Sequence, residues 1–361
     1  MSVGSEGRIP VAVLGATGAV GQTFIRLLEG HPFLEVSELA ASERSAGRFY
    51  REAMSWHEGK LPEHLMDLTV LPCDPGAVKS KVVFSALDSS VAGSVEQAFA
   101  RAGAVVLSNA KNHRMDADVP LVIPEVNADH LMLIDRQKEA RGWEGAIITN
   151  SNCAVAPMTM ALAPLHAAFG VRQAVMVTLQ AISGAGYPGV PSLDILGNVI
   201  PHIPGEEEKI EPELNKMLGE LEAGQVVNAP IIVSTHCNRV PVQHGHTVCM
   251  TLGFESSAGP EEVLEAMSEW QGHSICKGLP SAPSPPLVVR PEVNRPQARK
   301  DVDEGAGMAV VVGRVRSDPL MDVSLTAMAH NTVRGAAGGS ILNAEVLGRM
   351  GRLPGVTEGA W

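Results

Sequence analysis

An apolar segment that runs directly into a glycine-rich loop limits the folds open to this chain. Residues 9–14, IPVAVL, have the composition of a buried parallel strand, and GATGAVG follows at 15–21. A helix is then expected through Leu28. In this order, glycines permit a tight turn, close approach of the backbone to a pyrophosphate, and close packing of helix on strand. The spacing is GxxGxxG instead of GxGxxG, so a merely structural turn stays open. The candidate contacts are Gly15, Thr17, Gly18, Ala19 and Val20.

Strands and helices continue to alternate after this unit. Strand-like segments lie at 36–41, 68–71, 82–87 and 104–108, and a helix is expected over 91–102. This alternation predicts an α/β fold of the Rossmann type, with a doubly wound parallel sheet. At 361 residues the chain is too long for one ordinary core, so two domains are expected.

The segment after the second strand indicates which dinucleotide is bound. An acid at this point would hold the ribose diol of NAD, whereas an arginine with hydroxyl groups would receive the 2'-phosphate of NADP. Arg44 is flanked by Ser42 and Ser45, which together form an anion site, while Glu43 can face solvent. We therefore predict NADP. The alternative is a solvated charge pair in a surface loop.

Two further loops follow strands of the predicted sheet, where parallel sheets place ligands. The first contains Ser85 and Leu87, which are cofactor candidates. The second, SNAKNHR at 108–114, offers cations and amides in one loop. We expect Arg114 to contact an anion there and Asn109 to contact the substrate.

Cys153 lies between a strand-like run at 145–149 and an apolar helical pattern at 158–169. At a helix N-terminus, unpaired N–H groups and the positive end of the macrodipole favour a thiolate, so we expect a nucleophile at neutral pH. Pro157 fits the first turn of such a helix. The alternative is a small buried apolar residue.

Partners for this thiol lie in the second half. Gln180 is a polar residue in a strand-like segment over 173–182, shortly before the glycine-rich stretch SGAGYPG at 183–189. Glu206 and Lys209 lie three residues apart at the start of an expected helix, so they share one face; an acidic first turn that only caps the helix is the alternative.

Arginine and histidine occur on either side of a turn at 239–246. Arg239 has the planar fork that holds a carboxylate, and His246 or His244 is a candidate acid/base. Either histidine could instead be structural. An alternating strand is expected to follow, with others near 307–316 and 320–329.

Composition excludes several classes of protein. A net charge of -12 argues against a nucleic-acid partner, and no run approaches about 18 apolar residues, so a membrane span is not expected. Five scattered cysteines without a CxxC pair disfavour disulfides and a metal site, which makes a reducing cytoplasm the expected location. A YxxxK pair, GxxxxGK[ST], HExxH and GxSxG are absent from the sequence.

Taken together, seven stretches resemble the aspartate-β-semialdehyde dehydrogenase family, in its archaeal and fungal branch. The resemblance runs from about residue 9 to 348, in order, with Gln180 before the fourth stretch. The stretches are GATGAVG (15–21), ASERSAG (41–47), SNC (151–153), SGAGYPG (183–189), GEEEK (205–209), RVPVQHGH (239–246) and NTVRGAAGG (331–339).

The resemblance implies a role for each candidate residue. Cys153 would be the nucleophile, His246 the acid/base through its Arg-x6-His spacing, and Gln180 would orient the substrate. Arg239 would hold the substrate carboxylate, and Glu206 its amino group, with Glu207 and Glu208 as rivals. The phosphate of the substrate would lie near Lys209 and Arg114. Asn331 would lie beside the nicotinamide, and Ser183 and Gly184 would be further cofactor contacts. The Cys153 N–H, with Asn152 nearby, would form the oxyanion site.

The activity implied is NADPH-dependent reduction of aspartyl 4-phosphate to aspartate 4-semialdehyde through a cysteine thioester. Residues 1–152 and 331–361 would form the NADP-binding domain, and residues 153–330 a catalytic and dimerisation domain with a mostly antiparallel sheet. A homodimer or homotetramer is expected. The alternatives are N-acetyl-glutamyl-phosphate reductase, malonyl-CoA reductase, or a non-enzymatic NADP-sensing protein.

Overall fold

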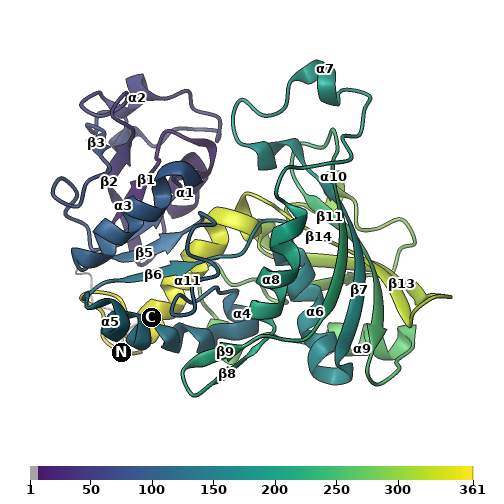
Figure 1. Cartoon of the computed structure of the whole chain (residues 1–361). Coiled ribbons are helices and arrows are strands. Elements are labelled where there is room, and N and C mark those ends of the chain that lie inside the picture. Colours follow the sequence, from purple (N-terminus) through teal and green to yellow (C-terminus); the bar gives the residue numbers. More distant parts are fainter. Residues whose placement is uncertain (1–6, 360) are drawn as a thin grey trace.

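Two six-stranded sheets organise the chain (Figure 1). The structure, a computed structural model, describes residues 7–359 and Trp361. The first sheet has the order β3-β2-β1-β4-β5-β6 and the second the order β10-β7-β11-β14-β13-β12. A short hairpin, β8 (Glu220–Glu222) and β9 (Gln225–Val227), lies apart from both.

The first sheet is parallel throughout, as expected for a Rossmann-type fold. Parallel strands must be apolar on both faces because helices cover both. Three of the six are buried from end to end, and β1 is buried over its last four residues. The strands are β1 (Ile9–Leu14), β2 (Leu34–Ala41), β3 (Leu71–Pro72), β4 (Val82–Ser85), β5 (Val105–Ser108) and β6 (Ala146–Thr149).

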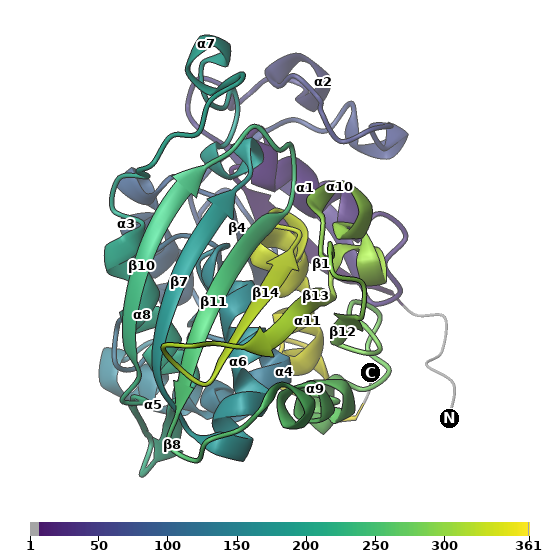
Figure 2. The same ribbon diagram turned by 90° about the vertical axis from the view of Figure 1, so that its right-hand side faces the viewer.

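The second sheet is mixed, with antiparallel pairing at its centre and a parallel pair at each edge. Helices α6, α8 and α9 pack on one face, and Figure 2 shows the other face uncovered. The predicted antiparallel strands are confirmed with shorter bounds. The strands are β7 (Val171–Gln180), β10 (Ile232–Arg239), β11 (His246–Phe254), β12 (Leu287–Arg290), β13 (Val310–Ser317) and β14 (Val323–Ala329).

The helices connect and flank the two sheets. They are α1 (Ala19–Leu28), α2 (Tyr50–Ala53), α3 (Ser89–Arg101), α4 (Pro124–Asn127), α5 (Leu133–Arg141), α6 (Val155–Phe169), α7 (Ser192–Ile195), α8 (Glu207–Met217), α9 (Pro260–Glu269), α10 (Ala298–Asp301) and α11 (Gly338–Arg349). Within the described residues, 7–359 and 361, no helix is both long enough and apolar enough to cross a bilayer.

One expected strand is largely wrong. Of residues 68–71, only Leu71 belongs to a strand. The Leu68 N–H donates to the carbonyl of Leu65, which closes a turn. The Val70 N–H donates to that of Arg48 beside a single antiparallel bridge between Thr69 and Phe49, so pairing here does not extend into a strand.

The C-terminal helix α11 completes the core of the first sheet. Ile341, Leu342 and Leu347 are buried in the same cluster as Val11 and Phe24. A π-helical turn, η6 (Val333–Ala337), precedes α11 and carries Arg334, which is buried. Its guanidinium forms an ion pair with buried Glu125 and donates from Nε to the Met308 carbonyl at 2.7 Å. This pair therefore ties η6 to α4.

We predict that Arg334→Met lowers the free energy of unfolding by about 3–5 kcal/mol, because Glu125 is left buried without its counter-charge. Urea denaturation measures this change. Arg8→Met is the matched control, since the Arg8–Glu35 pair is exposed at 41% and 45%, and we expect a loss of at most about 1 kcal/mol. Equal losses in the two variants would contradict a structural role for the buried pair.

Candidate active site

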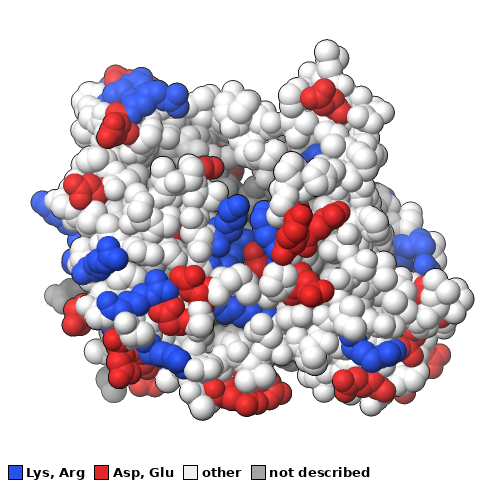
Figure 3. All heavy atoms as spheres, viewed as in Figure 1, with Lys and Arg blue, Asp and Glu red and all other residues white. Residues whose placement is uncertain are grey.

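The carboxyl end of the first sheet faces residues from the second. The loop after β6 carries Cys153. Gln180 and Arg239 are the last residues of two neighbouring parallel strands, and His246 is the first residue of β11. In the register of the sheet, Gln180 pairs with Arg239, so the two side chains enter the site together. Figure 3 shows charged side chains of both signs meeting in a hollow at the centre of the molecule. The structure thus brings together residues from four separate segments.

Cys153 lies beside His246. The distance from Cys153 Sγ to His246 Nε2 is 3.3 Å, and the other ring nitrogen, Nδ1, accepts the backbone N–H of Ala181 at 3.0 Å. His246 is fully buried, and Cys153 is partly exposed. The rival His244 contacts Ser183 Oγ through Nδ1 at 3.1 Å, and its ring stacks on His330 with centroids 4.9 Å apart, so its contacts are with these residues and not with the thiol.

The surroundings of Cys153 oppose the expected thiolate at rest. Burial raises the pKa of the Cys153 thiol to about 12, Glu206 adds to the rise, and Arg114 and Arg239 only partly oppose it. Burial also lowers the pKa of His246 to about 3, together with the charges of Arg239 and His330. The first helical residue of α6 is Val155, two residues beyond the thiol, so desolvation outweighs the helix dipole. Both groups are therefore neutral at neutral pH.

Asn152 fixes the loop before the nucleophile. Its Oδ1 accepts the Ala154 N–H at 2.7 Å, and its Nδ2 donates to Glu206 Oε1 at 2.8 Å. Its backbone N–H donates to Glu213 Oε2 at 2.7 Å. Both polar atoms of the Asn152 side chain thus have partners, and Nδ2 keeps a second N–H, so Asn152 and the backbone N–H of Cys153 are both candidate oxyanion donors.

The first glutamate of GEEEK is the one that faces the thiol. Glu206 is buried at the N-cap of α8, where it accepts Gln180 Nε2 at 3.4 Å and Lys209 Nζ at 3.0 Å. Glu207 instead accepts the Cys237 N–H at 2.8 Å, and Glu208 is exposed. The geometry separates the three rivals left open by the sequence.

Arg239 and Arg114 flank the thiol as cations. Arg239 is buried, and its Nη1 donates to the Ala181 carbonyl at 2.8 Å. Arg114 is also buried; it pairs with Glu213 at 2.9 Å and donates to the Asn109 carbonyl at 2.8 Å. Its Nε is buried without a hydrogen-bond partner among the described residues, so a donor remains for an anion.

Both polar atoms of the Asn109 amide have partners within the fold. Its Nδ2 donates to the Ser85 carbonyl at 3.1 Å, and its Oδ1 accepts Asn150 Nδ2 at 2.8 Å. The amide nitrogen keeps a second N–H, so the substrate contact of Asn109 stays a prediction. Asn109 links the ends of β4 and β6 behind Arg114.

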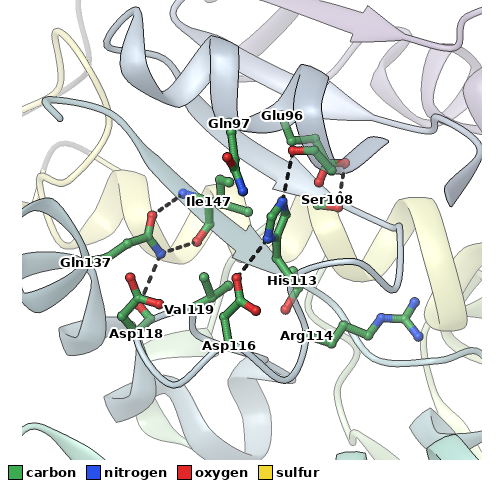
Figure 4. A network of polar contacts seen from close by, with 12 residues as sticks. Glu96, Gln97, Ser108, His113, Arg114, Asp116, Asp118, Val119, Gln137 and Ile147 are labelled. Carbon is green, nitrogen blue, oxygen red and sulfur yellow. Dashed lines mark hydrogen bonds and ion pairs between the residues drawn. The ribbon is translucent and has the colours of Figure 1, made fainter. Parts of the chain in front are cut away.

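A buried lysine holds the loop that carries Arg114. Lys216 Nζ donates to the carbonyls of Arg114, Asp116 and Val119 at 2.7, 2.8 and 2.9 Å. Figure 4 shows the polar contacts on the other side of this loop, where His113 Nδ1 meets Asp116 at 2.9 Å. Lys216 and Glu213 both lie on α8, the helix that begins beside Glu206, so one helix positions the Arg114 loop and the nucleophile loop.

The glycine loop forms a cradle that only glycine allows. Gly15 has φ +74°, and a Cβ there would lie 2.5 Å from the Ala86 carbonyl oxygen. A Cβ on Gly21 would lie 2.2 Å from the Gly15 carbonyl oxygen, so α1 approaches the loop without a gap. Gly18 is the N-cap of α1, and Ala19 and Val20 begin it, while Thr17 precedes them in the loop. The N-terminus of α1 is thus open toward a phosphate.

The other predicted cofactor residues differ in their exposure and in the partners of their polar groups. Ser42 and Arg44 are exposed after β2, and Ser45 is buried. Arg44 forms no ion pair with any described residue. Ser85 Oγ donates to buried Glu96 at 2.6 Å, so it points away from a ligand, while Leu87 in the following loop is half-buried.

Ser183, Gly184 and Asn331 meet next to His246. Asn331 donates to Ser183 Oγ at 2.8 Å and accepts the Gly245 N–H at 3.0 Å. A Cβ on Gly184 would lie 2.9 Å from both Arg239 Nη1 and His246 Nε2. Glycine is therefore needed at position 184 because its backbone covers these two side chains. Farther along it, Tyr187 stacks on His57 of the first domain, with ring centroids 4.4 Å apart.

Sequence reasoning missed three residues at the site. Glu213 and Lys216 have helical spacing and charge, which is also the pattern of a solvated helix face. Gly335 lies in η6, where a Cβ would be 2.8 Å from Cys153 Cβ. The glycine-rich run NTVRGAAGG was a signal for close approach, but the sequence did not show which glycine meets the thiol.

The glycine cradle and the cysteine–histidine pair define a class: dinucleotide-dependent oxidoreductases that act through a thiol. Residues 10–134 match a family model described as "Semialdehyde dehydrogenase, NAD binding domain", and residues 162–334 match "Semialdehyde dehydrogenase, dimerisation domain". The chain is 49% identical to aspartate-semialdehyde dehydrogenase of Methanothermobacter thermautotrophicus over 343 residues, which covers 94% of this chain and 99% of the relative.

Solved structures agree with this assignment. Aspartate semialdehyde dehydrogenase with NADP from Candida albicans has a TM-score of 0.86 and 42% identity, with 94% of this chain and 98% of that one covered. A Vibrio cholerae enzyme, aspartate semialdehyde dehydrogenase II complexed with ASA, has a TM-score of 0.73 and 26% identity, with 95% and 99% covered. The chain belongs to the aspartate-semialdehyde dehydrogenase family.

We predict that Gly335→Ala lowers kcat/KM by about 10²-fold, because the added methyl group must displace the nucleophile. Gly93→Ala is the matched control: it is also helical, and its Cβ would meet only the side-chain end of Asn112. Steady-state assays compare the two variants. Similar activities would show that η6 does not position the thiol.

Proposed function

We propose that the protein catalyses the NADPH-dependent reductive dephosphorylation of L-aspartyl 4-phosphate to L-aspartate 4-semialdehyde. The observation that carries the proposal is the 3.3 Å contact between Cys153 Sγ and His246 Nε2 beside paired charges of both signs. The sulfur attacks the acyl phosphate, phosphate leaves, and the acyl group is held as a thioester on Cys153. A thioester carbonyl accepts hydride more readily than a carboxylate, so the step makes reduction feasible.

The charges around Cys153 match an amino-acid substrate. Arg239 offers a planar cation to the α-carboxylate, and Glu206 offers a carboxylate to the ammonium group. Gln180, within 3.4 Å of Glu206, orients the substrate between them. Lys209 and the unpartnered Nε of Arg114 receive the phosphate. The Cys153 N–H donates to the carbonyl oxygen as negative charge develops there.

The residues present fit NADP. The close packing at Gly15 and Gly21 leaves no space for a side chain, which suits close approach of the backbone to a pyrophosphate, and exposed Arg44 with Ser42 and Ser45 suits the 2'-phosphate. When bound, NADPH supplies the hydride. Asn331 and Ser183, joined at 2.8 Å, would hold the nicotinamide ring.

The uncovered face of the second sheet is proposed as a subunit interface. Helices cover only one face of this sheet. Exposed residues of the sheet include Val175, Cys249 and Ile232. Antiparallel sheets tolerate solvent on one face, but exposed β-branched residues are better covered by a second copy of the chain. The family's dimerisation domain matches this region, which supports a homodimer or a tetramer built from dimers.

The two sheets suggest which part of the chain binds the cofactor and which binds the substrate. Residues 1–152 with 331–361 would bind NADP, and residues 153–330 would carry the substrate and the subunit contact. All five cysteines are free thiols, so we infer a cytoplasmic location.

The proposal is tested by NADP reduction with aspartate semialdehyde and phosphate, run beside N-acetyl-glutamate semialdehyde. We expect turnover with the former only, because Glu206 requires a free ammonium group. Cys153→Ala should lower turnover by at least about 10⁴-fold and leave NADPH binding unchanged. Cys249→Ala, which alters an exposed thiol, is the control. Substantial activity in Cys153→Ala, or preference for the acetylated substrate, would overturn the proposal.

Cofactor choice is tested at Arg44. We expect Arg44→Ala to weaken NADPH binding by about 1–3 kcal/mol and to leave NADH binding almost unchanged, because only NADPH carries the 2'-phosphate. Fluorescence titration of each cofactor measures the difference. Arg51→Ala, which removes an exposed ion pair with Asp67, is the control and should change neither affinity. Equal weakening of both cofactors would mean that Arg44 supports the loop instead.

A further inference from the structure

Two histidines flank Gly245, and their rings have different neighbours. His246 lies 3.3 Å from Cys153, whereas His244 Nδ1 lies 3.1 Å from Ser183 Oγ. Gly245 has φ +98°, a backbone conformation that favours glycine, and this tight turn sends the two rings to different partners. The reaction proposed above uses His246 and leaves His244 without a role.

The amide of Asn331 has a single orientation that satisfies its neighbours. The Gly245 N–H points at Oδ1 from 3.0 Å, and because a backbone N–H can only donate, this atom must be the oxygen. Nδ2 therefore donates to Ser183 Oγ at 2.8 Å. Nδ2 also carries a second N–H, which no residue among 7–359 and 361 accepts. Asn331 is buried, so it keeps one donor for a ligand.

The hydroxyl group of Ser183 links Asn331 to His244. Its oxygen accepts the Asn331 N–H, so its own hydrogen is left to donate, and His244 Nδ1 is within reach. Burial lowers the pKa of His244, so the ring is neutral at neutral pH and one of its nitrogens carries a lone pair. When that nitrogen is Nδ1, each hydrogen in the chain from Gly245 to His244 meets an acceptor.

The His244 ring and the Ser183 hydroxyl group are held in place by other contacts. The His244 ring stacks on His330, with centroids 4.9 Å apart, and His330 directly precedes Asn331 in the chain. The backbone N–H of Ser183 donates to the Gln243 carbonyl at 3.3 Å. The ring that accepts and the hydroxyl group that donates are therefore fixed separately, so their hydrogen bond needs little further ordering.

We propose that His244 is a positioning residue for the nicotinamide: it orients the Ser183 hydroxyl group and, through it, the Asn331 amide, whose second N–H is then available to the carboxamide group of the cofactor. This inference rests on the proposed function and deepens it. An amide that could turn over would present either a donor or an acceptor to the carboxamide, whereas the fixed amide presents only the donor. His244 has this effect without contacting the thiol.

Two substitutions separate the hydrogen bond of His244 from its ring stack. His244→Phe keeps an aromatic ring on His330 and removes the acceptor, whereas His244→Asn removes the ring and keeps an acceptor oxygen near the position of Nδ1. Isothermal titration calorimetry measures binding of NADPH and of 2'-phospho-ADP-ribose, which lacks the nicotinamide. We expect His244→Phe to weaken NADPH binding about 3–10-fold and His244→Asn by less than about twofold. Binding of the fragment should change by less than about twofold in both variants.

Ser183→Ala tests whether His244 acts through the hydroxyl group. In the Ser183→Ala background, His244→Phe should weaken NADPH binding no further, because the group that His244 orients is missing. Gln243→Ala is the control. Gln243 is exposed and adjacent to His244, and it contacts Ser183 through its backbone carbonyl, so this variant should bind both ligands as the wild type does.

Three results would overturn the proposal. Unchanged NADPH binding in His244→Phe would mean that the hydrogen bond is not needed. A loss in His244→Asn as large as that in His244→Phe would assign the effect to the ring stack. Equal losses for NADPH and the fragment would mean that His244 supports the cofactor site as a whole. If the wild type binds NADPH but does not turn over aspartate semialdehyde, the proposed function fails, while these affinities still decide the role of His244.

Discussion

The carboxylate of Glu213 joins the two chain segments that enter the site from the first sheet. One oxygen holds Arg114 and the other holds the backbone N–H of Asn152, next to the nucleophile. Such a buried charge is tolerated only because both oxygens are satisfied and a cation lies beside it. The spacing between the Arg114 cation and the Cys153 sulfur is therefore set by one side chain of α8, and the same helix begins at Glu206, beside the substrate's expected ammonium group.

Local sequence signals were sufficient for much of the fold and site. The strand, glycine loop and helix at 9–28 follow one another in the chain, so their geometry is encoded by neighbours. The same holds for Gln180 at the end of β7 and for Arg239 and His246 on either side of a turn. Their meeting with Cys153 was implied by family resemblance, because no periodicity indicates contacts over such distances.

What could not be predicted depends on tertiary burial. The helix dipole beside Cys153 can be read locally, but the desolvation that raises its pKa comes from η6, β7 and β11, which pack around it from later in the chain. Lys216 has the sequence context of a surface lysine and yet donates to three carbonyls of a loop about 100 residues earlier. The stretch at 278–296 has the proline- and serine-rich composition of a linker, but Leu287–Arg290 pairs with β13 as an edge strand, where proline on either side is tolerated.

The position of α11 has a consequence for how the protein is made. This helix fills the core of the first sheet with Ile341, Leu342 and Leu347, although the strands it covers are encoded by the first 149 residues. A ribosome therefore releases the whole second domain before the nucleotide-binding domain receives its last layer. During that interval the apolar surface around Val11 and Phe24 stays open on one side, so the two domains mature together and not in the order of synthesis.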